Sequence, residues 1–301
     1  MRQRFTIVLC TLLLNWVTAA AQGPAPDDLR AVKITTGRPP AETAVTIGRQ
    51  FLGVPYVPHT LDHQPTERLV VNLRAFDCTT FLETVLALTL ATLEVNDGRG
   101  AAPLDPAFRR YLVRIRYRDG RIDGYASRLH YFSDWLRDNE RRGLVADVTH
   151  ELPGQVMVAK PVSYMTTAVR KYPRLTDPGI YRQVARTEAA ISRQSFAFVP
   201  KKNVRLAEPY LHEGDLVLLT AARPGQDIKH VGFAVRQPDG RMHLLHASSE
   251  QGAVVISTQP LSDYVLSHKR LSGMRVARLR APVGSVASQT LSVRPVTAQV
   301  P

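Results

Sequence analysis

Cysteine is scarce in this 301-residue sequence, which contains only Cys10 and Cys78. Residues 1–21 combine the basic Arg2 and Arg4 with a short apolar run and an A-x-A-type cleavage site, and so predict a secretory signal peptide. Export to the periplasm or the medium is therefore expected. Removal of this segment leaves one cysteine, which excludes an intramolecular disulfide and indicates a reactive thiol.

The sequence also lacks a second long apolar run and an excess of acidic residues. No segment after residue 21 is expected to insert stably into a membrane. The chain has 39 Lys and Arg against 26 Asp and Glu, for a net charge of +13 at pH 7. The basic residues are scattered, which with export argues against nucleic acid. Attraction to an acidic cell-envelope polymer is one interpretation of the charge, and simple solubility is the other.

The periodicity of apolar residues predicts helices first and strands later. Residues 22–40 are expected to form a flexible arm, 41–281 a catalytic domain and 282–301 a disordered tail. Helices are predicted over 41–53, 79–93, 104–111, 132–142 (capped by Ser133), 163–172, 180–193 and 260–267. Strands are predicted over 67–72, 216–221, 230–236, 242–248, 254–257 and 274–279, with a β-hairpin over 111–128.

This order of elements favours an α+β fold, with an antiparallel sheet packed against the helix at 79–93. The interval from about 98 to 212 is expected to be an insertion of mainly helical and hairpin structure. No internal repeat is visible.

Cys78 lies where a polar turn becomes an apolar helix. A helix N-terminus favours the thiolate over the thiol, and a nearby histidine can hold the proton. Cys78 is therefore the candidate nucleophile, provided that the fold brings a base to it.

Two of the nine histidines are candidates for that base and its orienting partner. His230 begins an alternating strand, and His246 lies on the next strand. A three-residue loop at 238–240, with Gly240 in the left-handed region, predicts a register that places His246 opposite Gly232 and on the face of His230. His246 could then orient the imidazole of His230 as the third member of a triad. A two-residue turn would instead put the histidines on opposite faces.

A zinc site is an alternative use of the same three side chains, Cys78, His230 and His246. The chain lacks a second cysteine near Cys78 and any H-x-x-x-H pair on a helix, which are common features of zinc sites. Neither a metal nor an organic cofactor is therefore expected.

Several short motifs together resemble the NlpC-type papain-like cell-wall hydrolases. The motifs are Gly53–Tyr56, Asp77-Cys78, Gly214–Val217, His230–Ala234 and His246–Ser248. The long separation of Cys78 from His230 is similar to that of the N-acetylmuramoyl-L-alanine amidase-like branch. The same branch is also similar to this chain in three short segments, Pro58–Asp62, Asn72–Phe81 and Arg128–Trp135.

The resemblance implies a papain-like fold that cleaves the amide between the lactyl group of N-acetylmuramic acid and the L-alanine of the stem peptide. Peptidoglycan or its muropeptide fragments would be the substrate. Cys78 would be the nucleophile, His230 the base and His246 its orienting partner. Tyr56 would contact the substrate or the oxyanion, or only pack after the Pro turn. Asp77 would bind a substrate amine or cap the helix.

The insertion supplies further candidates for substrate contacts, namely Arg128, Tyr131 and Trp135. They are expected to wall the cleft and to contact the stem peptide, although the spacing of Trp135 on a helix also fits a core position. Two other functions remain open on the sequence alone. One is an endopeptidase that cuts the stem after D-glutamate, and the other is a non-catalytic wall-binding module. The sequence does not specify an oligomeric state.

Overall fold

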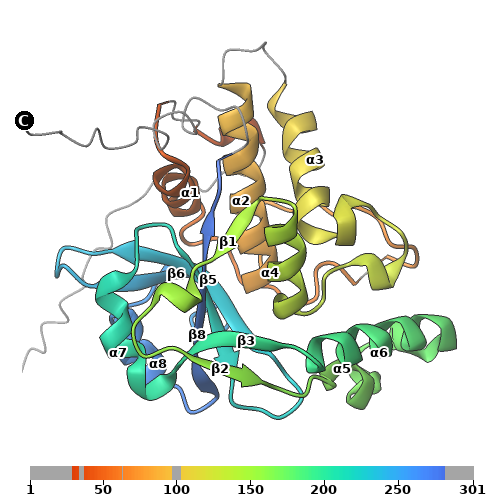
Figure 1. Ribbon diagram of the computed structural model, residues 1–301. Helices are drawn as coiled ribbons and strands as arrows, with labels where there is room; N and C mark the ends of the chain where they lie inside the picture. The colour runs from red at the N-terminus through yellow and green to blue at the C-terminus, as the bar shows by residue number, and fades with distance from the viewer. Residues whose placement is uncertain (1–28, 34–36, 63, 97–102, 282–301) are drawn as a thin grey trace, which may run out of the picture.

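An antiparallel sheet between two groups of helices forms the body of the protein in the computed structural model (Figure 1), which describes residues 29–33, 37–62, 64–96 and 103–281. The helices are α1 (Pro40–Arg49), α2 (Cys78–Val95), α3 (Leu104–Arg116), α4 (Phe132–Arg141), α5 (Tyr164–Thr167), α6 (Pro178–Ser192), α7 (Val204–Ala207) and α8 (Leu261–Ser267). The strands are β1 (Val145–Asp147), β2 (Val156–Ala159), β3 (Ser195–Pro200), β4 (Leu216–Ala221), β5 (Ile228–Arg236), β6 (Met242–Ser248), β7 (Ala253–Ile256) and β8 (Leu271–Leu279).

The sheet has the order β2-β3-β8-β4-β5-β6-β7, and β1 also pairs with β8. Side chains alternate across a strand, so Leu216 and Leu218 of β4 enter one core while Val217 and Leu219 enter another. The first core also holds side chains of α1 to α4, and the second holds those of α7 and α8. Figure 1 shows these two helical groups on either side of the sheet. The mixed α/β class with an antiparallel sheet is therefore confirmed.

α2 lies at the centre of the molecule and is apolar on all sides. Every side chain from Thr80 to Thr92 is buried, and the helix packs against α1, α3, β5 and β6. Among the described residues, α2 is the one helix long and apolar enough to cross a membrane, and 72% of it is buried inside the protein. Burial on every side identifies it as a core helix.

The predicted β-hairpin over 111–128 is wrong. Its first part continues α3 as far as Arg116, and the remainder forms short 3-10 turns with one isolated bridge between Tyr117 and Arg128. The buried side chains of α3 recur at helical spacing, at Phe108, Tyr111, Leu112 and Ile115. Burial of this stripe against α2 outweighs the strand-like alternation of the same segment.

Two further predictions are wrong, the strand at 67–72 and the cap of α4 by Ser133, because distant residues bind the backbone at both places. The segment 67–72 is not a strand, and the Val70 carbonyl accepts a hydrogen bond from the Arg116 side chain at 2.8 Å. Ser133 does not cap α4. Its backbone N–H instead donates to the Asp227 carboxylate at 2.8 Å. In both places a side chain from elsewhere satisfies backbone groups that local structure was expected to satisfy.

The strands predicted at 216–221 and 242–248 have the observed bounds, the other predicted helices and strands are present with shifted ends, and the predicted helix at 163–172 is reduced to α5 and a 3-10 turn. The insertion also contains three strands that were not predicted, β1, β2 and β3. Because β1 and β3 both pair with β8, the insertion is part of the same sheet as β4 to β7. The predicted signal peptide and the predicted tail lie outside the described residues, as do residues 22–28 and 34–36 of the predicted arm.

Candidate active site

Cys78 is the first residue of α2, and the residues beside it hold the helix start in place. The Asp77 carboxylate accepts a hydrogen bond from the Thr80 N–H at 2.8 Å, and the Thr80 hydroxyl accepts one from the Asp77 N–H at 2.9 Å. This reciprocal pair is a capping box. It leaves the backbone N–H groups of the first turn directed outward from the helix end, beside the Cys78 thiol.

Tyr56 lies beside the nucleophile because its segment runs alongside the residues that precede α2. Phe76 donates its N–H to the Pro55 carbonyl at 3.0 Å and accepts one from Val57 at 2.9 Å. Tyr56 therefore reaches the same cleft as Cys78. Burial, followed by the negative charges of Cys78 and Asp77, raises the pKa of Tyr56 to about 12. Its hydroxyl therefore remains a hydrogen-bond donor at neutral pH.

The hairpin of β5 and β6 has the register that the sequence predicted. Gln237 donates to the Arg241 carbonyl at 3.1 Å, which leaves a three-residue loop in which Gly240 has a φ of 77°. Phe233 pairs with Leu245, so Gly232 lies opposite His246. A Cβ on Gly232 would lie 2.9 Å from the Cβ of His246, closer than real Cβ contacts allow. The glycine therefore permits the close approach that brings His246 to His230.

His230 and His246 contact each other directly. The Nε2 atom of His230 lies 2.6 Å from the Nδ1 atom of His246, and the two rings meet at 84°. If His230 carries its proton on Nε2 and donates it to His246, its Nδ1 atom is free to act as a base. His246 then carries its own proton on Nε2. That atom is buried without a hydrogen-bond partner in the described part of the chain. The ring of Tyr264 lies close by, at a centroid distance of 5.6 Å.

The surroundings of Cys78 favour the thiol over the thiolate. Burial raises the pKa of Cys78 to about 12, and the negative charge of Asp77 adds to the effect. Hydrogen bonds with the Val231 backbone and Thr79, and the charge of Lys229, act in the opposite direction. In the free protein, desolvation therefore outweighs the stabilisation of the thiolate that the sequence analysis expected from the helix terminus.

The surroundings of the two histidines favour their neutral forms. Burial lowers the pKa of His230 well below its ordinary value, and positive charge on His246 and Lys229 adds to this. Burial, followed by the charge of His268, lowers the pKa of His246 to about 4. Burial therefore favours a neutral thiol and two neutral imidazoles in the free protein.

A cleft of about 160 Å³ opens over the thiol. It is lined by Tyr56, Cys78, Lys229, His230, Ser248, Ser249, Glu250, Tyr264, His268, Arg270 and Leu271. His246 lies behind His230 and is only 1% exposed, which fits a residue that acts through its neighbour. A neutral thiol, a base with a free nitrogen and a helix N-terminus are the groups that acyl transfer requires.

The three candidates from the insertion are not among the residues that line this cleft. Arg128 is 7% exposed and pairs with Asp62 at 2.7 Å. Tyr131 donates its hydroxyl to Glu188 at 2.5 Å, and Trp135 is fully buried. Their polar groups bind other residues of the protein, so the structure gives them positions in the packing of the insertion. The Asp77 side chain likewise caps α2 and is not among the lining residues.

Eight residues that line the cleft were absent from the sequence-based candidates, namely Lys229, Ser248, Ser249, Glu250, Tyr264, His268, Arg270 and Leu271. Tyr264 and His268 come from α8 and the turn that follows it, and their rings stack at a centroid distance of 4.0 Å. Glu250 pairs with the Nε2 atom of His268 at 3.2 Å. Lys229 and Arg270 are exposed cations at the same opening. Only Lys229, which precedes His230 in sequence, carried a local signal that could have identified it.

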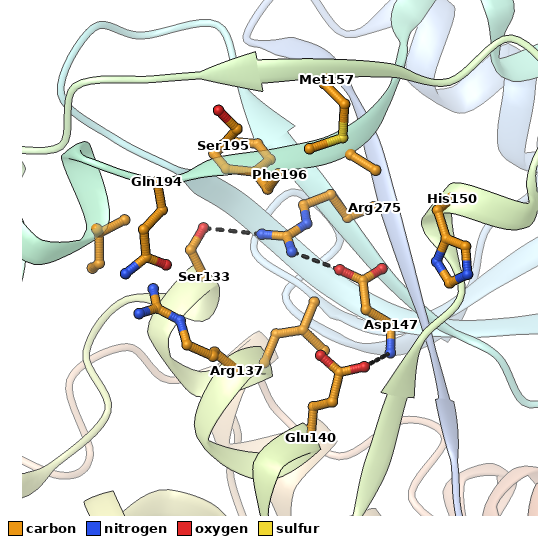
Figure 2. Close-up of a pocket in the computed structure, with 13 residues that line it drawn as sticks. Ser133, Arg137, Glu140, Asp147, His150, Met157, Gln194, Ser195, Phe196 and Arg275 are labelled. Carbon is orange, nitrogen blue, oxygen red and sulfur yellow. Dashed lines mark hydrogen bonds and ion pairs between the residues drawn. The ribbon is translucent and has the colours of Figure 1, made fainter.

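A larger cavity than this cleft lies elsewhere in the protein (Figure 2). It has a volume of about 420 Å³ and is lined by residues of α4, β3 and β8 and their neighbours. Arg275 pairs there with Asp147 at 2.7 Å and donates to the Ser133 hydroxyl at 3.2 Å. Glu140 accepts a hydrogen bond from the Asp147 backbone at 2.9 Å. Both carboxylates are therefore engaged in structural contacts, and no cysteine lines this cavity.

Within the described residues, no group of three or more His, Cys, Asp or Glu side chains is placed to hold a metal ion. The contact between His230 and His246 occupies the two ring nitrogens that face each other. These two nitrogens therefore bind each other and are not available as ligands of a metal ion.

Comparison with known proteins shows that the chain is related to amidase-like hydrolases of the cell wall. A family model described as AmiA-like, N-acetylmuramoyl-L-alanine amidase-like, matches residues 46–274. The chain belongs to this N-acetylmuramoyl-L-alanine amidase-like family. A comparison with curated proteins finds no match.

Solved structures of bacterial proteins resemble the chain over most of its length. A Bacteroides fragilis protein whose name proposes a xylanase is 39% identical, with a TM-score of 0.71 over 77% of this chain and 99% of its own. A Bacteroides uniformis N-acetylmuramoyl-L-alanine amidase is 34% identical, with a TM-score of 0.72 over 80% of this chain and 99% of its own. A Legionella pneumophila protein at 21% identity and a TM-score of 0.58, over 81% of this chain and 90% of its own, shares the fold.

Proposed function

We propose that the protein is an exported cysteine amidase that hydrolyses the amide between N-acetylmuramic acid and the L-alanine of the stem peptide. We also propose that residues 41–281 form one papain-like catalytic domain of the NlpC type. The observation that carries the proposal is that the Cys78 thiol, at the start of α2, and His230 line one cleft, while His246 contacts His230 from behind. Family membership supports the choice of bond.

In this mechanism His230 acts first as a base and then as an acid. Its Nδ1 atom takes the proton of the Cys78 thiol as the sulfur attacks the lactyl carbonyl carbon. The negative charge on the carbonyl oxygen is stabilised by backbone N–H groups at the start of α2 and by the Tyr56 hydroxyl. Cleavage of the carbon–nitrogen bond passes the proton from His230 to the departing L-alanine nitrogen and leaves a thioester on Cys78.

Water completes the reaction. His230 removes a proton from the water as it attacks the thioester, and the released thiolate takes the proton back. The products are the lactyl carboxylate of the sugar and a stem peptide with a free L-alanine amine. His246 keeps the His230 ring oriented throughout, because its Nδ1 atom accepts the Nε2 proton at a distance of 2.6 Å.

The composition of the cleft supports this choice of bond over two others. An endopeptidase that cuts after D-glutamate and recognises a free amine on L-alanine would need an available carboxylate in the cleft. Glu250 is the one carboxylate among the described residues that line the cleft, and His268 already pairs with it. A xylanase of the usual kind needs two carboxyl groups across the scissile bond, and the cleft does not supply a pair.

Mass spectrometry of a defined muropeptide tests the proposal. N-acetylmuramic acid carrying a full stem is incubated with the mature protein and with Cys78→Ser, which differs by one atom. Release of free stem peptide by the wild type alone is the expected result. A cut inside the stem would move the specificity to the endopeptidase, and the absence of cleavage would favour a wall-binding module.

Export is tested separately, because residues 1–21 lie outside the described part of the chain. The intact mass of the protein recovered outside the cytoplasm should correspond to a chain that begins after Ala21. Recovery of the full-length chain in the cytoplasm alone would contradict the proposal.

A further inference from the structure

Two irregularities in the sheet meet at one end of β4, beside the cleft. Between β4 and β5, the pairing changes from Leu219 with His230 to Thr220 with Ile228, so Lys229 is an extra residue. Between β4 and β8, a similar shift occurs after Thr220. Such β-bulges leave a residue unpaired and redirect its side chain, and they are frequent next to active sites.

The bulge in β5 changes which residues reach the cleft. Neighbouring residues of a regular strand point to opposite faces, yet Lys229 and His230 both line the cleft. The charge of Lys229 acts on both Cys78 and His230, which places it beside the reacting groups. Arg270, which immediately precedes β8, lines the same opening. The two irregular strand ends therefore bring two cations to the nucleophile.

These two cations lack the carboxylate partners that buried arginines of the insertion such as Arg116 and Arg128 have. Lys229 and Arg270 are exposed, and neither side chain has an ion pair within the described residues. The one carboxylate among the described residues that line the cleft, Glu250, is paired with His268 at 3.2 Å. Cations that are aimed at a catalytic cleft and left unpaired present a site for an anion of the substrate.

The chemistry of the proposed substrate identifies that anion. Before cleavage the lactyl carboxyl is part of the scissile amide and carries no charge. The first free carboxylate on the peptide side is the α-carboxylate of the D-glutamate that follows L-alanine, since this residue continues the stem through its side chain. It lies one residue beyond the bond that Cys78 attacks.

We propose that Lys229 and Arg270 bind this α-carboxylate and so select stems with D-isoglutamate over stems in which that group is a neutral carboxamide. The assignment rests on the proposed function and defines its specificity at the second stem residue. Lys229 supplies a point charge, and Arg270 supplies a planar group that can donate two parallel hydrogen bonds to a carboxylate.

A matched pair of substrates tests the assignment. Two N-acetylmuramoyl tripeptides are compared that differ only in the second residue, D-isoglutamate or D-isoglutamine. For the wild type, kcat/KM should favour the carboxylate by about tenfold to a hundredfold, the range expected for charge-assisted contacts. In the double variant Lys229→Met, Arg270→Met the ratio should fall to about one, and each single variant should give an intermediate ratio.

The control is Lys269→Met, which removes an exposed cation next to Arg270 that does not line the cleft. This variant should keep the wild-type ratio. Because the readout is a ratio of two substrates on one protein, partial loss of folding in a variant does not affect it. A wild-type ratio near one, or a ratio that survives in the double variant, would overturn the assignment and leave the amidase proposal standing. Cleavage of neither tripeptide by the wild type would overturn both.

Discussion

The cleft at Cys78, the proposed active site, and the larger cavity of Figure 2 differ in how their charges are arranged. In the larger cavity, of about 420 Å³, Arg275 and Asp147 pair with each other and Glu140 binds backbone. In the cleft, of about 160 Å³, Lys229 and Arg270 have no such partners beside a thiol and an imidazole. Volume is therefore a poor guide to function here. Unpaired charge next to a nucleophile is the more informative property.

The cations of the cleft differ in the same way from buried cations of the insertion, which have ion-pair partners. Arg116 and Arg128 of the insertion are buried and paired with Glu83 and Asp62 respectively. Removal of a buried cation should therefore reduce stability, whereas removal of a cleft residue should reduce activity or change specificity. The following experiments test this difference, from the largest expected effect to the smallest.

Replacement of the nucleophile should have the largest effect. Cys78→Ser should lower kcat for muropeptide hydrolysis by more than about a thousandfold, because a serine hydroxyl is a far weaker nucleophile with this base. The midpoint of thermal unfolding should change little, since the side chains are similar in size. Activity within tenfold of wild type would show that the cleft is not the catalytic site.

Replacement of Arg116 should reduce stability strongly. Its Nε atom lies 2.6 Å from Glu83, and both side chains are buried. Arg116→Met would leave Glu83 buried without its partner and should lower the free energy of unfolding by about 3–5 kcal/mol, measured by urea denaturation. The control is Arg109→Met on the same helix, which removes an exposed pair with Asp105 and should cost less than about 1 kcal/mol. Equal losses of unfolding free energy in the two variants would contradict the difference between the buried and the exposed ion pair.

Replacement of His246 should lower kcat through His230. His246→Leu removes the acceptor of the 2.6 Å contact and should lower kcat by about a hundredfold, less than the roughly 10⁴-fold loss known for a buried charged partner. His246→Asn keeps an acceptor near the Nδ1 position and should restore much of the rate. A merely structural role would lower stability in both variants and would show no such recovery of kcat.

The last experiment concerns the ionisation of the resting thiol and needs no substitution in the protein. Since burial raises the pKa of Cys78 to about 12, the rate of iodoacetamide labelling in the free protein should increase about tenfold per pH unit between pH 7 and 10. Mass spectrometry of the peptide that contains Cys78 gives the rate. A plateau near neutral pH would instead indicate a thiolate–imidazolium pair formed before substrate binds.

Local patterns in the sequence were sufficient where neighbours along the chain decide the structure. The start of α2 at Cys78 follows from the polar Asp77 and the apolar run after it. The register of β5 and β6 follows from a three-residue loop ending in Gly240. Such features depend on turn geometry and on alternation, which are readable over a few residues.

Tertiary structure decided what depends on contacts between distant segments. The burial of Arg128 and Trp135, the desolvation that favours the Cys78 thiol, and the pairing of β1 and β3 with β8 arise from packing of the insertion and the core. The bulge at Lys229 arises from the pairing of β5 with β4, and no local sequence pattern predicts it. The sequence by itself therefore indicated Cys78, His230 and His246, the proposed nucleophile and its histidines. Only the tertiary structure decided which of the many cations faces them, because burial and pairing are properties of the whole fold.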